Sequence, residues 1–110
     1  MRFDANDYKG RYAMHCATEK EANIFLEYLD SIGRKWSSSK KYTDENYFYN
    51  YYENTTYDFN QSCYGSFDWF IEEGYEILEF TDFEWDGYKA EEVVSDDELL
   101  NFIGGNYGTC

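Results

Sequence analysis

The sequence contains no proline, one histidine and few basic residues. Nine lysines and arginines stand against 23 aspartates and glutamates, which gives a net charge of −14. A field of this sign repels nucleic acid and anionic membranes, so neither is expected as a direct partner. The same field attracts a basic protein surface. The alternative interpretation is that the charge serves solubility alone.

Long apolar runs are also missing. No stretch approaches the length of a membrane span, and the first residues, Met1 to Asp4, lack the apolar segment of a signal peptide. The three cysteines, Cys16, Cys63 and Cys110, are odd in number and widely spaced, which is not the pattern of a disulfide framework. These absences predict an intracellular protein with reduced cysteines.

What the chain does contain is a large number of aromatic residues. Its 13 tyrosines, 9 phenylalanines and 3 tryptophans supply most of the apolar volume, within a hydrophobic fraction of 43%. That fraction is sufficient for a globular core, and 110 residues allow one domain, residues 1–110. Tyrosine combines a large contact area with a polar tip, so many of these rings can lie at a surface.

Local patterns predict an alternation of strands and helices. Residues 11–16 alternate as a strand, and Thr18 to Glu21 form a capping box that opens a helix ending at Gly33. Further strands are expected at 34–36, 47–52, 55–59 and 75–80, a short helix between Ser66 and Gly74, and a last helix opened by Ser95 to Glu98. This order predicts the α+β class, a mainly antiparallel sheet with two to three helices packed on it.

The charge is distributed unevenly along the chain. Residues 1–42 carry six acids against eight bases, a balance of +2, whereas residues 43–110 carry 17 acids against the single base Lys89, a balance of −16. The densest part is residues 72–86. Two of its acids, Glu72 and Glu73, follow a predicted short helix, where the helix dipole favours cations instead. We therefore interpret the segment as a candidate binding surface.

The candidate partner-binding residues are carboxylates with aromatic neighbours that serve as anchors: Glu72, Glu73, Glu76, Glu79, Asp82, Glu84 and Asp86, with Tyr75 and Trp85. If the segment is one strand, acids two residues apart lie roughly 6.7 Å from each other. Two base steps of a duplex span about 6.8 Å. The row would then mimic nucleic acid in a basic groove. The alternatives are a solvated face and neutralisation by bases of the first half.

Catalytic and metal sites are weakly supported. Asp82, Glu84 and Asp86 followed by Gly87 resemble the start of an EF-hand loop, but its twelfth position is Val93 instead of glutamate. A looser divalent-cation site remains an alternative. The neighbours His15 and Cys16 point to opposite faces of a strand and do not form a nucleophile pair. We therefore expect a protein that is not an enzyme and carries no cofactor.

Aromatic residues are concentrated between positions 42 and 59: Tyr42, Tyr47, Phe48, Tyr49, Tyr51, Tyr52, Tyr57 and Phe59. One interpretation is a sheet with one face in the core and a tyrosine-rich outer face. The other is a recognition surface for a protein or for a stacking ligand such as a nucleotide. A small-ligand binder or sponge is therefore the alternative function.

Several motifs carry a resemblance to a group of known proteins. Three stretches of the chain resemble short phage and prophage proteins of Gram-positive bacteria. The first is Cys16-Ala17-Thr18-Glu19-Lys20-Glu21-Ala22, continuing to Phe25, Leu26, Leu29, Gly33 and Trp36, and the others are Glu53 to Tyr57 and Glu73 to Phe80. Small acidic phage proteins include anti-CRISPR inhibitors, several of which occupy nucleic-acid-binding surfaces of Cas nucleases. The resemblance implies a cytoplasmic inhibitor in a bacterial host, with such a nuclease as partner. The oligomeric state stays open.

Overall fold

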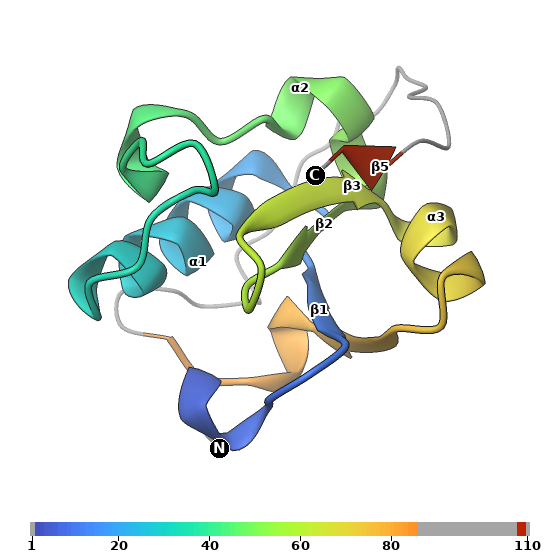
Figure 1. Ribbon diagram of the computed structural model, residues 1–110, viewed down its shortest axis with the longest axis horizontal. Helices are drawn as coiled ribbons and strands as arrows, with labels where there is room; N and C mark the ends of the chain where they lie inside the picture. The colour runs from blue at the N-terminus through green and yellow to red at the C-terminus, as the bar shows by residue number, and fades with distance from the viewer. Residues whose placement is uncertain (1, 86–107, 110) are drawn as a thin grey trace.

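The computed structural model describes residues 2–85 and 108–109. Its strands form one sheet in the order β4-β1-β2-β3-β5 (Figure 1). The strands are β1 (Tyr12–His15), β2 (Thr55–Asp58), β3 (Cys63–Ser66), β4 (Glu76–Glu79) and β5 (Gly108–Thr109). Neighbouring strands run antiparallel, except that β1 and β4 run parallel. With its helices this is the predicted α+β class, and the sheet is mixed.

The first long helix, α1, spans Glu19–Ser31 and begins at the predicted capping box. Thr18 Oγ1 accepts the amide of Glu21 at 3.1 Å, and the Glu21 carboxylate accepts the amide of Ala17 at 2.9 Å. The helix ends ahead of Gly33, whose φ of +85° lies in the left-handed region that glycine tolerates. These contacts confirm both ends of the predicted helix.

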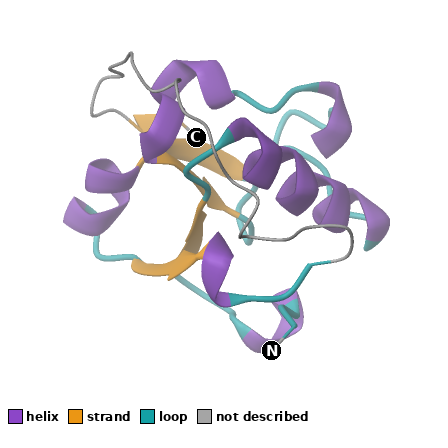
Figure 2. Ribbon diagram, turned by 180° about the vertical axis from the view of Figure 1, so that it is seen from behind, coloured by secondary structure: helices purple, strands orange, loops and turns teal. Residues whose placement is uncertain are grey.

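Two helices cover opposite faces of the sheet. Helix α3 (Phe67–Glu72) lies on the other side of the strands from α1, as Figures 1 and 2 show. Side chains of β1 alternate between the two, because successive strand residues point to opposite faces. Met14 belongs to the core cluster that includes Phe25 of α1, whereas the His15 ring lies 5.0 Å from that of Phe67 in α3.

The predicted strand at 47–52 is wrong. This part of the chain forms a one-turn helix α2 (Phe48–Tyr51) and a 3-10 turn η3 (Tyr52–Asn54), after an earlier 3-10 turn η2 (Tyr42–Asp44). Phe48 and Tyr51, three residues apart as on one face of a helix, are buried. This helical period was not visible in the sequence, because the neighbouring residues are also aromatic. Strand β2 pairs instead with β3, which was not predicted.

The remaining elements follow the sequence more closely. Ser66 caps α3 by accepting the amide of Trp69 at 3.2 Å, as predicted. The expected strand at 34–36 is reduced to one antiparallel bridge between Lys35 and Lys41. Two further 3-10 turns, η1 (Ala5–Asp7) and η4 (Phe80–Asp82), complete the described elements. The predicted helix after Ser95 lies outside the described residues, and none of the described helices could cross a membrane.

The cysteines differ from expectation. Cys63 is disulfide-bonded, whereas Cys16 is a free and fully buried thiol. The prediction that all the cysteines are reduced is therefore wrong for Cys63. Wide spacing along the sequence does not prevent two cysteines from meeting in the fold, because disulfide formation depends on distance in space.

Candidate protein-interaction site

The acidic segment 72–86 is not one extended strand. It passes from the end of α3 through β4 into η4, where the amide of Phe83 donates to the carbonyl of Phe80 at 3.2 Å. Because Asp82 lies in this turn, the predicted straight row Asp82, Glu84 and Asp86 is wrong. Asp86 itself lies outside the described residues. The turn forms here because it brings both Phe80 and Trp85 into the core.

Trp85 is a core residue and not an anchor. Its side chain is 8% exposed, its indole Nε1 donates to the carbonyl of Phe80 at 2.9 Å, and the two rings stack with centroids 4.6 Å apart. The predicted partner-binding role of Trp85 is therefore wrong. The indole also lies against the rings of Phe3 and Phe25, and burial of a large aromatic side chain in such a cluster stabilises the fold.

Tyr75 is half-buried and also fills an internal role. Its hydroxyl donates to Asp58 Oδ2 at 2.7 Å, and the Arg11 guanidinium lies 4.8 Å above its ring. Burial, together with the hydrogen bond to the Asp58 carboxylate, raises the pKa of Tyr75 to about 12. Tyr75 therefore fixes the α3–β4 connection to β2, which leaves its hydroxyl unavailable to a partner.

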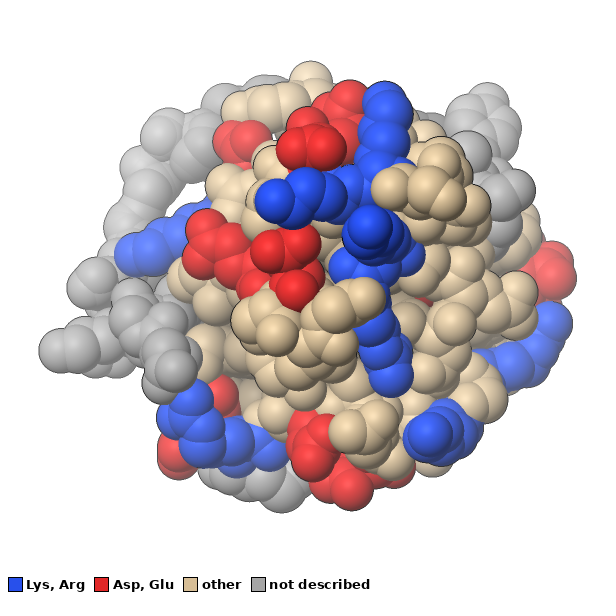
Figure 3. All heavy atoms as spheres, turned by 60° about the vertical axis from the view of Figure 1, so that its left-hand side comes forward, with Lys and Arg blue, Asp and Glu red and all other residues tan. Residues whose placement is uncertain are grey.

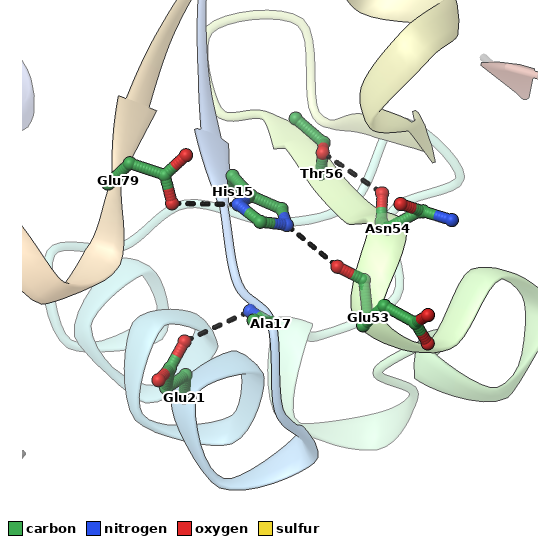
Figure 4. A network of polar contacts seen from close by, with 7 residues as sticks. All are labelled: His15, Ala17, Glu21, Glu53, Asn54, Thr56 and Glu79. Atoms are coloured by element: carbon green, nitrogen blue, oxygen red, sulfur yellow. Dashed lines mark hydrogen bonds and ion pairs between the residues drawn. The ribbon is translucent and has the colours of Figure 1, made fainter. Parts of the chain in front are cut away.

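Basic groups of the first half lie against part of the acidic segment. Parallel pairing of β1 with β4 places His15 opposite Glu79, and Nδ1 of His15 lies 2.7 Å from a carboxylate oxygen of Glu79 (Figure 4). Arg11 donates to the backbone carbonyl of Glu73. Neutralisation by the first half, the alternative weighed from sequence, thus applies to Glu79 and in part to the surroundings of Glu73.

The other carboxylates of the segment remain on the surface. Five of the seven candidate acids, Glu72, Glu73, Glu76, Asp82 and Glu84, are exposed. Glu72, Glu73 and Glu76 lie at the connection between α3 and β4. Asp68, which is exposed, and Ile71, which is 49% exposed, lie just before them in α3. We call Asp68, Ile71, Glu72, Glu73 and Glu76 the acidic turn. The exposed candidate acids thus form a smaller set than the sequence predicted, and the exposed apolar side chain of Ile71 lies within the same short stretch of chain.

Ile71 was missed as a site residue because the sequence groups it with Phe67 and Phe70 as the apolar side of a short helix. A six-residue helix buries one narrow stripe, and here Phe70 occupies it with no exposed surface. Asp68, Ile71 and Glu72 are spaced three and four residues apart, which places them on the outer face of α3. The adjacent apolar pair at positions 70 and 71 was the available signal.

His15 takes part in a structural network and not in a nucleophile pair. Its Nε2 lies 2.7 Å from the carbonyl oxygen of Glu53, so the ring joins β1, β4 and η3 (Figure 4). Cys16 faces the opposite side, and burial first, then Glu21 and Glu79, raises the pKa of its thiol well above the ordinary value. A thiol held neutral in this way is a poor nucleophile.

Most of the aromatic cluster is core. Tyr42, Phe48, Tyr51, Tyr57 and Phe59 are buried, and Tyr47 stacks on Tyr64 with centroids 4.1 Å apart. The outer face of the cluster is therefore limited to Tyr49, which is 62% exposed, and Tyr52, which is 37% exposed. A continuous tyrosine-rich sheet surface does not form, because residues 47–52 are not a strand.

A cavity of about 490 Å³ lies between α1 and residues 42–49. Four carboxylates line it, Glu19, Glu27, Asp44 and Glu45, together with the exposed ring of Tyr49. Glu19 accepts hydrogen bonds from the Tyr49 hydroxyl at 2.5 Å and from the Asn46 amide at 2.9 Å. The hydrogen bond from Tyr49 to Glu19, and then the charge of Glu19, raise the pKa of Tyr49.

The side of the molecule that carries α1 and residues 34–44 has mixed charge. Figure 3 shows a column of lysine and arginine side chains there, with aspartate and glutamate side chains beside it. The bridge between Lys35 and Lys41, and the hydrogen bond from the Trp36 amide to the Lys40 carbonyl at 2.9 Å, bring three lysines close together. The acidic turn, on α3 and β4, lies on different elements.

No metal centre was found in the described part of the chain, where no group of three or more histidine, cysteine or acidic side chains could hold an ion. The proposed cation site at Asp82 to Asp86 extends beyond the described residues. Comparison of the chain with protein-family models, with curated proteins and with solved structures finds no match.

Proposed function

We propose that this protein is a non-enzymatic binding protein that docks its acidic turn onto a basic surface of a partner protein. The observation that carries the proposal is Ile71, an isoleucine that is 49% exposed and has four exposed carboxylates within five residues of it in the sequence. An apolar contact within a charged rim is the usual composition of a protein interface. The carboxylates guide the approach, and Ile71 supplies the contact from which water is excluded.

The resemblance to phage proteins suggests the kind of partner. A basic surface that binds nucleic acid, as on a Cas nuclease, attracts the negative field of the turn, and the protein would then act as an inhibitor by occupying that surface. The place of action in this proposal is the bacterial cytoplasm. The disulfide at Cys63 favours an oxidising compartment instead. Trapping of the thiols in intact host cells tests this part of the proposal: a reduced Cys63 thiol supports the cytoplasm, and a disulfide contradicts it.

A nucleotide-binding function is less favoured. The cavity beside Tyr49 is lined by carboxylates, and the described residues around it include no lysine or arginine. The phosphates of a nucleotide would meet like charge there, with no cation to offset the repulsion. The exposed aromatic ring is therefore not sufficient support for that alternative.

The test compares capture from host lysate by three forms of the protein at low and high salt. Glu72→Lys with Glu76→Lys reverses two charges of the acidic turn. Asp7→Lys with Glu53→Lys makes the same change of net charge at exposed acids elsewhere. We expect wild type and the second variant to capture the same basic protein, released by high salt, and the first variant to lose it.

An Ile71→Ser variant separates the two parts of the surface. It removes the apolar contact without changing charge. Capture of the partner is therefore expected to weaken, while high salt still releases the partner that remains bound. The proposal is wrong if capture is insensitive to salt, or if the Asp7 and Glu53 variant loses the protein as completely as the acidic-turn variant.

A further inference from the structure

We propose that the cavity between α1 and residues 42–49 is a second binding site, which takes an aliphatic organic cation such as a guanidinium or alkylammonium group. This inference is independent of the acidic turn, because the two sites share no residue. It rests on three properties of the cavity: its size, the arrangement of its wall and a lining, within the described residues, that holds carboxylates and neither lysine nor arginine.

The first property is size. A volume of about 490 Å³ lies within the range of pockets that hold small organic ligands. One side of it is α1, and the other is the chain from η2 to α2. These two sides are joined by the hydrogen bonds from the Asn46 amide to the side chains of Glu19 and Asn23, both at 2.9 Å. The cavity therefore has walls that are already in position before a ligand arrives.

The second property is the arrangement of the wall around Glu19. Both of its carboxylate oxygens are occupied, one by the hydroxyl of Tyr49 and the other by the amide of Asn46. The hydroxyl bond holds the exposed ring of Tyr49 beside the cavity. A cation that enters meets a fixed carboxylate and an aromatic ring together, the combination that recognises ammonium and guanidinium groups.

The third property is the charge of the lining. The side chains of Glu27, Asp44 and Glu45 line the cavity and make no ion pair or hydrogen bond with another described residue. Together with Glu19 they make the wall of the cavity negative. A ligand of opposite charge is attracted to this wall, whereas an anion is repelled by it.

The cation has two sources with the same chemistry: a free diamine-like metabolite or the arginine side chain of a protein. Agmatine, the amine that corresponds to an arginine side chain, probes the first, and the peptide Gly-Gly-Arg-Gly-Gly amide probes the second. The peptide with citrulline in place of arginine is the control, because its urea group has nearly the same shape as guanidinium without the charge. Binding is followed by two-dimensional NMR of the amide groups of Asn23 and Asn46.

We expect agmatine or the arginine peptide to shift these signals with saturation, and the citrulline peptide to leave them unchanged. Saturation by agmatine indicates a free cation, and saturation by the peptide alone indicates a protein side chain. The variant Glu27→Gln with Glu45→Gln removes two charges with little change of shape and should weaken binding roughly tenfold. Glu72→Gln with Glu76→Gln on the acidic turn should leave binding unchanged.

The proposal fails if neither cation shifts the signals, or if the citrulline peptide shifts them equally. It also fails if the acidic-turn variant weakens binding as much as the cavity variant, because the attraction would then come from net charge. The ligand comparison uses wild-type protein, so it stands even where a variant is unstable. Failure here leaves the capture experiment on the acidic turn unaffected.

Discussion

The imidazole of His15 lies 2.7 Å from the carboxylate of Glu79, and the two residues are register partners on the parallel strands β1 and β4. The second ring nitrogen is 2.7 Å from the carbonyl of Glu53. Both neighbours are acceptors, and a neutral imidazole has only one N–H to donate. A ring with one N–H therefore donates to one of the two acceptors, and a ring with two N–H groups donates to both.

Replacement of His15 by phenylalanine should therefore destabilise the fold. The variant keeps a ring next to Phe67 and loses both hydrogen bonds, so the free energy of unfolding is expected to fall by about 1–2 kcal/mol. Urea unfolding followed by circular dichroism measures the change. Glu76→Gln is the control, since Glu76 lies exposed on β4, the strand of Glu79, and its replacement should alter stability by less than about 0.5 kcal/mol. Equal losses in both variants would contradict a specific role of His15.

Trp85→Ala should unfold the protein or nearly so. The side chain contacts Phe3, Phe25 and Phe80 in the core, and removal of a buried indole typically costs about 3–5 kcal/mol. Thermal unfolding of Trp85→Ala and Trp85→Phe gives the comparison, with phenylalanine expected to retain most of the stability. A Trp85→Ala protein as stable as wild type would contradict the core role of the indole.

The fold was predictable where local signals act alone. The capping box at Thr18 and Glu21, the cap at Ser66 and the glycine after α1 each depend on side chains within four residues, and each is present. The stretch 47–52 failed because its residues are nearly all aromatic, so that neither a strand nor a helical period is visible. There the side chain of Asn46 accepts the Phe48 amide at 2.9 Å and starts α2 instead.

The site was predictable in charge and not in geometry. Exposure of Glu72 and Glu73 follows from their position at the end of a short helix next to Gly74, which the sequence indicates. The pairing of Glu79 with His15 depends on a contact between residues 64 positions apart, and the burial of Trp85 depends on the turn at Phe80. Contacts of this kind are fixed by tertiary packing, and no local pattern encodes them.

Tyr75 should make stability depend on alkaline pH. Its pKa is raised from the ordinary 10.0 to about 12 in the folded protein, so between these values the unfolded chain loses a proton that the folded protein keeps. Stability contributed by Tyr75 is therefore complete below pH 10 and is lost as pH rises toward 12. Urea midpoints of wild type and Tyr75→Phe from pH 8 to 11.5 measure this. The difference between the two should shrink above pH 10, and a constant difference would contradict it.

Glu72→Lys should have opposite effects on stability and on binding. Glu72 is the last residue of α3 and is exposed, and the negative end of the helix dipole disfavours a carboxylate at that position. A lysine there should raise the free energy of unfolding by about 0.3–1 kcal/mol. The same change reverses one charge of the acidic turn, so the basic partner should bind more weakly and with less dependence on salt.

Urea unfolding and the salt series of the capture experiment give the two readouts for Glu72→Lys, and Glu72→Gln gives the neutral intermediate in both. Stability should increase in the order glutamate, glutamine, lysine, while capture decreases in that order. These two orders together would show that Glu72 lowers the stability of the fold and contributes to binding of the partner. If lysine instead lowers both stability and capture, Glu72 is a structural residue, and the binding surface must be sought elsewhere on the fold.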